Sequence, residues 1–277
     1  MLIWAALLVA CAQPAPEEAI LPVAASPTPE ALVIRVTGSH TMEPLLRELA
    51  RTYMRENTSV IIEVSGGGSR WAIEALHSGQ AEIGMVSRPL DTSERADAAG
   101  NVVLVETPIA RDGLALIVHP GNPINKMERA QLASIFAGDL FLWDDMGWLA
   151  GQIQVVSREA GSGDRAVMEA LLLPEGRPLS LNAVLMPEPA AVVAYVAKEP
   201  DALGYVSLAQ LSSVVKVLRV DNVTPSLETV ASGEYPFARD LLLVTLGSPE
   251  GEVQRFMAWV LGPEGQRIVA RRYLPMQ

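Results

Sequence analysis

The residues best suited to chemistry lie in a glycine-rich segment, residues 157–165, with the sequence Ser-Arg-Glu-Ala-Gly-Ser-Gly-Asp-Arg. The segment follows the apolar run 153–156 and precedes apolar residues at helical spacing, which predicts a turn between a strand and a helix. The first N–H groups of a helix have no intrahelical acceptor and the helix dipole is positive there, so this position favours an anion. Arg158 and Ser162 add further donors. A helix that is merely capped by Ser162 or Asp164 is the alternative.

Two earlier turns and one strand end carry the same residue types. The apolar patterns predict strands over residues 32–36, 60–64 and 82–86. The first strand leads through the turn 38–41 (Gly-Ser-His-Thr) into a predicted helix, and the second leads through the turn 66–69 (Gly-Gly-Gly-Ser) into another. The third strand ends at Ser87 and Arg88. Because ligands of open α/β sheets bind beyond the carboxyl ends of strands, we expect these residues to gather around one small anion.

The composition fits a folded protein whose partner is not a nucleic acid. The chain has 277 residues, of which 49% are hydrophobic, enough for one large domain or two lobes of moderate size. Its formal charge is −11 and its pI is about 4.8, whereas a nucleic-acid partner requires a basic face. This charge does not exclude a small anion, because local dipoles and arginines hold it while charges beyond about 10 Å are screened.

The N-terminal residues are typical of a targeting segment. Residues 2–10 form an apolar run of nine residues, far fewer than the roughly 20 of a membrane-spanning helix, and the run ends at Cys11, the only cysteine. Residues 8–11 (Leu-Val-Ala-Cys) resemble a bacterial lipobox, so we expect residues 1–11 to be a lipoprotein signal peptide that ends at a lipidated Cys11. The sequence departs from that pattern because no lysine or arginine precedes the run. The alternative is a buried free cysteine in an ordinary apolar segment.

The residues that follow have the composition of a linker. Residues 12–30 are rich in proline and alanine and lack an apolar period, which predicts an extended, mobile tether. A single cysteine allows no intramolecular disulfide, so cysteine usage does not identify the compartment.

The sequence offers little for catalysis. Its three histidines, His40, His77 and His119, lack the spacing of metal ligands, so we expect no metal and no cofactor. Ser162 stands in Gly-Ser-Gly, whereas a nucleophile elbow requires Gly-x-Ser-x-Gly and a histidine late in the chain, and no histidine follows His119. We therefore do not expect an enzyme. A secreted serine hydrolase is the least favoured alternative.

The ordered set of turns resembles a known family. Residues 38–44, 66–69, 83–88 and 157–163 are similar to the motifs of PstS-type phosphate-binding proteins, the substrate-binding components of phosphate ABC importers. Further similar segments are 135–138 with Trp143, 203–206, 235–239, 262–266 and 273–275. The resemblance therefore covers nearly all of residues 32–277.

The resemblance implies an α/β architecture, the two-lobed type II periplasmic-binding-protein fold. In that fold, mixed sheets are flanked by helices, and two crossover segments form a hinge about which the lobes close. Residues 31–110 and 219–277 would form lobe 1, and residues 111–218 would form lobe 2.

The resemblance also implies which residues contact the bound anion. They supply hydroxyl groups, helix-start N–H groups and one guanidinium, which match the several acceptor oxygens of a tetrahedral oxyanion. By position they are Thr41, the backbone N–H of Met42, Ser69, Ser87, Arg158, Ser162 and Gly163. Ser39, Arg88 and Asp164 complete the predicted site.

Two positions depart from the family. Arg88 stands where many members have an acidic residue that accepts the proton of hydrogen phosphate and so rejects sulfate, and Asp164 stands where threonine is usual. We hypothesise that Asp164 supplies the missing acceptor and that Arg88 balances its charge. The alternative is that Asp164 only caps the helix or pairs with Arg158 or Arg165.

The resemblance implies a binding protein that performs no chemistry. We expect a monomeric lipoprotein, anchored to the cell membrane in the periplasm or at the cell surface, that captures inorganic phosphate and delivers it to ABC permease subunits. The alternatives are a protein for another oxyanion, such as sulfate, tungstate or molybdate, and a phosphate-sensing partner protein. We expect contact with the membrane through the lipid anchor only.

Overall fold

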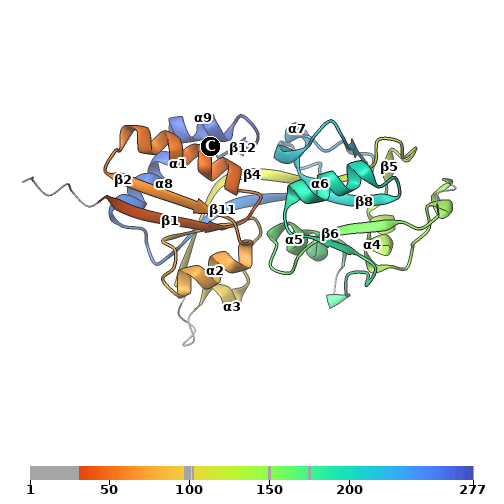
Figure 1. Cartoon of the computed structure of the whole chain (residues 1–277), viewed down its shortest axis with the longest axis horizontal. Helices are drawn as coiled ribbons and strands as arrows, with labels where there is room; N and C mark the ends of the chain where they lie inside the picture. Colours follow the sequence, from red (N-terminus) through yellow and green to blue (C-terminus); the bar gives the residue numbers. More distant parts are fainter. Residues whose placement is uncertain (1–30, 97–100, 102, 149–150, 174–175, 277) are drawn as a thin grey trace, which may run out of the picture. The chain divides into compact units, whose positions relative to one another are not determined.

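The structure is a computed structural model that describes residues 31–96, 101, 103–148, 151–173 and 176–276. The predicted signal peptide with Cys11 and the predicted linker lie outside the described residues. Strands and helices alternate along most of the described chain, which confirms the predicted α/β class (Figure 1).

The elements fall into three consecutive stretches of the chain. The first contains β1 (Leu32–Gly38), α1 (Glu43–Glu56), β2 (Val60–Ser65), α2 (Ser69–His77), β3 (Ile83–Val86), α3 (Thr92–Arg95) and β4 (Leu104–Val118). The second contains β5 (Lys126–Met127), α4 (Arg129–Ala137), the 3-10 helix η1 (Trp143–Met146), β6 (Gln154–Arg158), α5 (Gly163–Leu172), β7 (Val184–Met186), α6 (Pro189–Lys198), β8 (Ala202–Ser207), the 3-10 helix η3 (Leu208–Gln210), β9 (Lys216–Val217) and β10 (Arg219–Val220). The third contains α7 (Leu227–Ala231), β11 (Ala238–Leu246), α8 (Gly251–Leu261), α9 (Pro263–Val269) and β12 (Leu274–Pro275).

One mixed sheet runs through both lobes. It has ten strands in the order β2-β1-β3-β11-β4-β8-β6-β7, with β9 and β12 also paired to β4. β1 is parallel to β2 and β3, while β11 is antiparallel to β3 and β4. Residues 104–113 of β4 pair with β11, and residues 114–118 pair with β8. The chain therefore passes from one lobe to the other along β4 and returns at the start of β11.

Two large hydrophobic clusters form the cores of the two lobes. The first joins β1, α1, α8 and α9 and includes Leu46 and Phe256. The second joins the end of β4 with α4 and α5 and includes Trp143. Tyr235 and Phe237 also belong to the second cluster, so its core takes in residues beyond the predicted boundary at 218. The exact bounds of the lobes stay a prediction.

The sequence of α1 explains why the helix begins at the edge of the sheet. Leu45, Leu49 and Tyr53 are buried and recur at helical spacing, and Pro44 lies in the first turn, where a missing N–H costs no hydrogen bond. Full burial of one leucine side chain contributes about 1.5–3 kcal/mol. The apolar face therefore holds the start of α1, and Thr41 just before it, against the sheet.

One local boundary differs from the prediction. β6 extends through Arg158, so Ser157 and Arg158 end a buried strand instead of beginning a turn. Arg158 pairs in parallel register with Met186 of β7. The sheet thus fixes the backbone of Arg158, which a turn would not do.

Neither a membrane span nor a metal cluster is found in the described part of the chain. None of its helices combines the length and hydrophobicity that are needed to cross a bilayer. Its histidine, cysteine, aspartate and glutamate side chains form no group of three or more that could hold a metal ion.

Candidate anion-binding site

The structure buries nearly all of the predicted site residues where strand ends meet helix starts. The buried ones are Ser39, Thr41, Met42, Ser69, Ser87, Arg158, Ser162, Gly163 and Asp164. In the first lobe they lie after the ends of β1, β2 and β3, up to the first residue of α2. In the second lobe they lie from the last residue of β6 to the start of α5. Arg88 is the predicted site residue that is only partly buried.

Serine hydroxyl groups form the first-lobe side of the site. Ser39 Oγ donates to Ser87 Oγ at 2.9 Å, and Ser69 Oγ lies 3.4 Å from Ser87 Oγ. The backbone N–H of Ser87 donates to Ser69 Oγ at 3.1 Å. These hydroxyl groups exchange hydrogen bonds among themselves, and a hydroxyl can rotate to donate to an added acceptor.

Gly163 brings the second lobe directly against these hydroxyl groups. A Cβ atom at this position would lie 2.4 Å from Ser69 Oγ and 2.3 Å from Ser87 Oγ, well inside contact distance. Nearby, the N–H of Arg70 donates to the carbonyl of Gly161 at 3.1 Å, so the turns after β2 and β6 also touch. A larger residue at position 163 would therefore force the two turns apart.

Asp164 is the centre of a buried charge network. Thr41 Oγ1 lies 2.8 Å from Oδ1 and 2.9 Å from Oδ2 of Asp164 and donates to this carboxylate. Arg239 Nη1 donates to Asp164 Oδ1 at 2.7 Å, and Arg158 Nη1 lies 3.5 Å from Oδ2. Arg239 Nη2 also pairs with Asp112 at 3.1 Å. The network thus links the turn after β1, the start of α5 and the paired strands β4 and β11.

The pKa directions follow from burial and from the two guanidinium groups. Burial disfavours ionisation of Asp164, but Arg239 and Arg158 outweigh it, so the pKa of this carboxyl lies below its ordinary value. Burial dominates at Asp112 and raises the pKa of its carboxyl, although Arg239 opposes the rise. Asp164 is therefore ionised at neutral pH and acts only as a hydrogen-bond acceptor.

Arg158 is held in place by main-chain carbonyls. Its Nε donates to the carbonyl of Met186 at 3.1 Å and its Nη2 donates to that of Pro187 at 2.8 Å. Its side chain is only 2% exposed, and Glu159 forms an additional ion pair with it at 3.0 Å. The guanidinium is therefore fixed in position, with Nη1 toward Asp164.

Ser162, and not Asp164, caps α5. The Ser162 side chain accepts from the N–H of Arg165 at 3.4 Å, while Arg165 forms its ion pair with Glu169 at 2.8 Å. Of the alternative stated for Asp164, the helix cap and the pairing with Arg165 are wrong, whereas the pairing with Arg158 is present. Asp164 instead faces Thr41, Arg158 and Arg239.

Met42, the last predicted site residue of the turn after β1, uses its backbone N–H within that turn. This N–H donates to the carbonyl of Ser39 at 3.1 Å.

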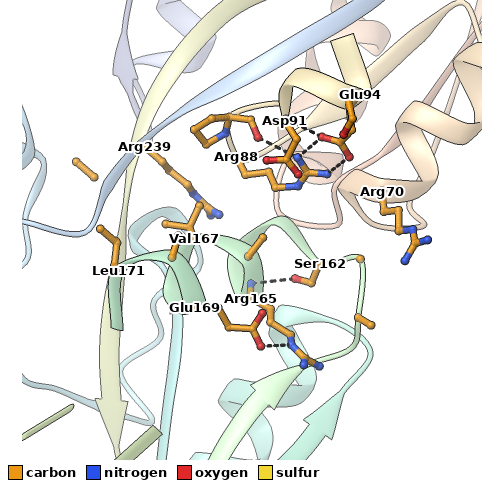
Figure 2. A pocket seen from close by; sticks show the side chains of 17 residues that line it. Arg70, Arg88, Asp91, Glu94, Ser162, Arg165, Val167, Glu169, Leu171 and Arg239 are labelled. Carbon is orange, nitrogen blue, oxygen red and sulfur yellow. Dashed lines mark hydrogen bonds and ion pairs between the residues drawn. The ribbon is translucent and has the colours of Figure 1, made fainter. Parts of the chain in front are cut away.

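Arg88 lies apart from this network. Its two terminal nitrogens donate to the carboxylate of Glu94, each at 2.6 Å, and Nη1 also donates to the carbonyl of Pro89 (Figure 2). The expectation that Arg88 balances the charge of Asp164 is therefore wrong. Arg239 performs that role through a direct ion pair.

A pocket of about 780 Å³ opens beside the buried network. Arg88 and Glu94 lie on its first-lobe side, and Val167 and Leu171 of α5 lie on the other, as Figure 2 shows. Ser162 and Arg239 also line this pocket, which places it next to the buried site. The pocket therefore indicates a direction from which solvent reaches the site.

The fold agrees with the comparison to known proteins. The PBP superfamily domain matches residues 23–264, most of the chain. The chain belongs to the PBP superfamily. Within this superfamily it is similar to the phosphate-binding protein PstS of Bacillus subtilis, with 27% identity over 235 residues, covering 84% of this chain and 77% of the relative.

Two solved structures extend this similarity to three dimensions. One is a Clostridium perfringens protein described as a phosphate ABC transporter substrate-binding protein, with phosphate bound; its TM-score is 0.82 at 30% identity, covering 88% of this chain and 100% of that one. The other is an ABC-type phosphate transport receptor from Vibrio cholerae, with a TM-score of 0.74 at 27% identity and coverages of 88% and 100%. These similarities confirm the predicted family and the two-lobed fold of this superfamily member.

Sequence reasoning missed Arg239 and Asp112. Arg239 lies in the segment 235–239, which contributed to the family resemblance but received no role. Asp112 precedes Gly113 in what was expected to be a break between lobes. A lone arginine in an apolar strand, such as Arg239 in β11, was the available signal, because a buried charge requires a partner.

Proposed function

We propose that this chain is an extracytoplasmic solute-binding protein that captures inorganic phosphate between its two lobes and delivers it to an ABC importer. The observation that carries the proposal is the buried convergence of serine and threonine hydroxyl groups with Arg158 at the point where Gly163 brings the lobes together. Phosphate has four oxygens, and such a set of fixed donors matches a small tetrahedral anion better than it matches an extended substrate.

The donors come from both lobes, so binding and closure are linked. Ser69 and Ser87 would donate from the first lobe, while Arg158 and the N–H of Gly163 would donate from the second. A ligand that bridges these groups favours the closed arrangement of the lobes by its differential contacts. Thr41 would exchange its hydrogen bond to Asp164 for one to the ligand or share it between the two.

Asp164 gives the site a means to distinguish phosphate from sulfate. Its ionised carboxylate lies among the donors and can accept the proton of hydrogen phosphate. Fully ionised sulfate has no such proton and would place oxygen lone pairs against the carboxylate, which is unfavourable in a buried site. Arg239 keeps Asp164 ionised, and this supports a preference for protonated phosphate.

The remaining features of the proposal follow from the family and the N-terminal sequence. The chain performs no chemical step, because the hydroxyl groups of its buried serines exchange hydrogen bonds with one another, an arrangement that supplies no general base to generate a nucleophile. It is a monomeric lipoprotein anchored through Cys11 in the periplasm or at the cell surface. Its protein partners are the permease subunits of the importer.

Calorimetric titration of the ligand-free protein tests the proposal. Phosphate should bind at one site per chain, and sulfate should bind far more weakly. If tungstate or molybdate bound and phosphate did not, the proposed site would stand and the ligand would be that anion instead of phosphate. Absence of binding for all four anions would overturn the proposal, and turnover of a phosphate monoester would reassign the protein to catalysis.

A further inference from the structure

A basic groove lies on the first lobe, outside the anion site. Helices α1 and α9 line a groove of about 600 Å³. Its charged lining residues are the five arginines Arg47, Arg51, Arg55, Arg267 and Arg271 and the two glutamates Glu48 and Glu264. The lining thus carries five positive and two negative charges, whereas the whole chain has a formal charge of −11. The local excess of positive charge opposes the charge of the protein as a whole.

Part of this positive charge is not neutralised by the protein. Arg47 pairs with Glu43 of the same helix, Arg271 pairs with Glu48, and Arg267 lies 3.8 Å from Glu264. Arg51 and Arg55 are exposed, and among the described residues they form no ion pair and no side-chain hydrogen bond. Their guanidinium groups are therefore free to bind carboxylates or phosphates with two parallel hydrogen bonds.

The spacing of the arginines is regular. Arg47, Arg51 and Arg55 follow one another at every fourth position of α1; across the groove lie Arg267 of α9 and Arg271, two residues beyond the end of that helix. At a rise of about 1.5 Å per residue, successive arginine side chains start about 6 Å apart along α1. A helix with acidic residues at every fourth position presents its carboxylates at this same interval.

We propose that the groove between α1 and α9 is a docking site for an acidic helix of a partner protein. Charge complementarity supports this occupant, and the regular spacing fits carboxylates on a helix. A flat anionic bilayer fits less well, because the arginines surround a hollow and because Glu48 and Glu264 would be brought against the lipid phosphates. The proposal does not depend on which anion the cleft binds.

A labelled helical peptide provides the test. The probe is an alanine-based peptide with glutamate at every fourth position, and the comparison peptide has glutamine at those positions. Binding to the full chain is measured by fluorescence anisotropy at low and at high salt. The glutamate peptide should bind, and binding should weaken about tenfold or more between about 50 mM and 500 mM salt, because exposed charge pairs are screened.

Charge-reversal variants test whether the peptide binds in the groove. The double variant R51E/R55E should lose about tenfold or more of the affinity for the glutamate peptide, because two attractive contacts become repulsive. The matched double variant R219E/R255E reverses two exposed arginines outside the groove and should retain the affinity of the unchanged protein. Equal affinity of R51E/R55E and the unchanged protein would overturn the proposal.

Two further measurements distinguish a helical partner from a membrane surface and from the anion site. Binding of the unchanged protein and of the same variants to vesicles that contain phosphatidylglycerol is also measured. Binding to vesicles but not to the glutamate peptide would assign the groove to the membrane and overturn the proposal. Phosphate titration of R51E/R55E should match the unchanged protein, because the groove lies outside the anion site. Failure of phosphate to bind any variant would reject the proposed function while leaving the groove result intact.

Discussion

Asp164 and Arg239 are 75 residues apart in the sequence, yet Arg239 Nη1 donates to Asp164 Oδ1 at 2.7 Å. Their side chains are only 2% and 1% exposed. Breaking such a buried pair is strongly destabilising, because the remaining charge has lost its partner and cannot reach water. The pair therefore connects the start of α5, next to the glycine-rich turn 159–163, to β11, the strand that returns between the lobes.

We expect Asp164→Asn to weaken discrimination between phosphate and sulfate. The amide can donate to a sulfate oxygen, whereas the carboxylate can only accept, so the ratio of the phosphate and sulfate affinities should fall about tenfold or more. Parallel calorimetric titrations of the two anions measure this ratio. An unchanged ratio would show that Asp164 does not act as the proton acceptor.

We expect Arg239→Met to lower the free energy of unfolding by about 3–5 kcal/mol, because it leaves the carboxyl groups of Asp112 and Asp164 without their shared partner. Urea unfolding measures the change. The surface variant Arg219→Met is the control and should change stability by less than about 0.5 kcal/mol. Adding Asp112→Asn to Arg239→Met should restore part of the lost free energy of unfolding. A further decrease would show that the unpaired carboxylates are not the cause of the destabilisation.

Stability should fall in acid partly through Asp164. The pKa of its carboxyl is lowered in the folded state, so unfolding takes up a proton at low pH. This contribution is fully present above the ordinary pKa of about 3.8 and is lost as the pH falls toward the lowered value. Urea unfolding between about pH 6 and pH 3 should therefore show a smaller acid loss for Asp164→Asn than for the unchanged protein. Identical pH profiles would contradict the ionised state of Asp164.

We expect Gly163→Ala to impair anion binding more than folding. The added Cβ would meet the hydroxyl oxygens of Ser69 and Ser87 at less than 2.5 Å, and the lobes can relieve that clash by separating. Overpacking of this kind costs about 1–3 kcal/mol, which would appear as weaker phosphate binding. Calorimetry and urea unfolding on the same sample separate the two effects. A loss of stability as large as the loss of affinity would contradict a role in closure.

The sequence predicted the local structure around the site because the signals there are local. Short apolar runs located β1 and β2, and glycine-rich turns located the starts of α2 and α5. Hydroxyl-bearing residues at strand ends then converge because parallel strands place their carboxyl ends at one edge of the sheet. Ser39, Ser69 and Ser87 meet for this reason alone.

The charge partners could not be predicted from the same signals. Arg88 follows the end of β3 and Arg239 is the second residue of β11, and neither position indicates which carboxylate the arginine pairs with. Their partners are set by tertiary packing: Glu94 lies close to Arg88 along the chain, whereas Asp112 reaches Arg239 only through the register of β4 against β11. Pairing across such distances depends on the completed sheet.

The network of Asp112, Asp164 and Arg239 also restricts which substitutions these three positions can accept during evolution. The register of β11 against β4 places Arg239 directly opposite Asp112, and Asp164 supplies the second negative charge. A homologue in which one of these residues is replaced leaves a buried charge on the other two without its partner. We therefore expect the three positions to evolve together, with a neutral residue at position 164 accompanied by a compensating substitution at position 112 or 239.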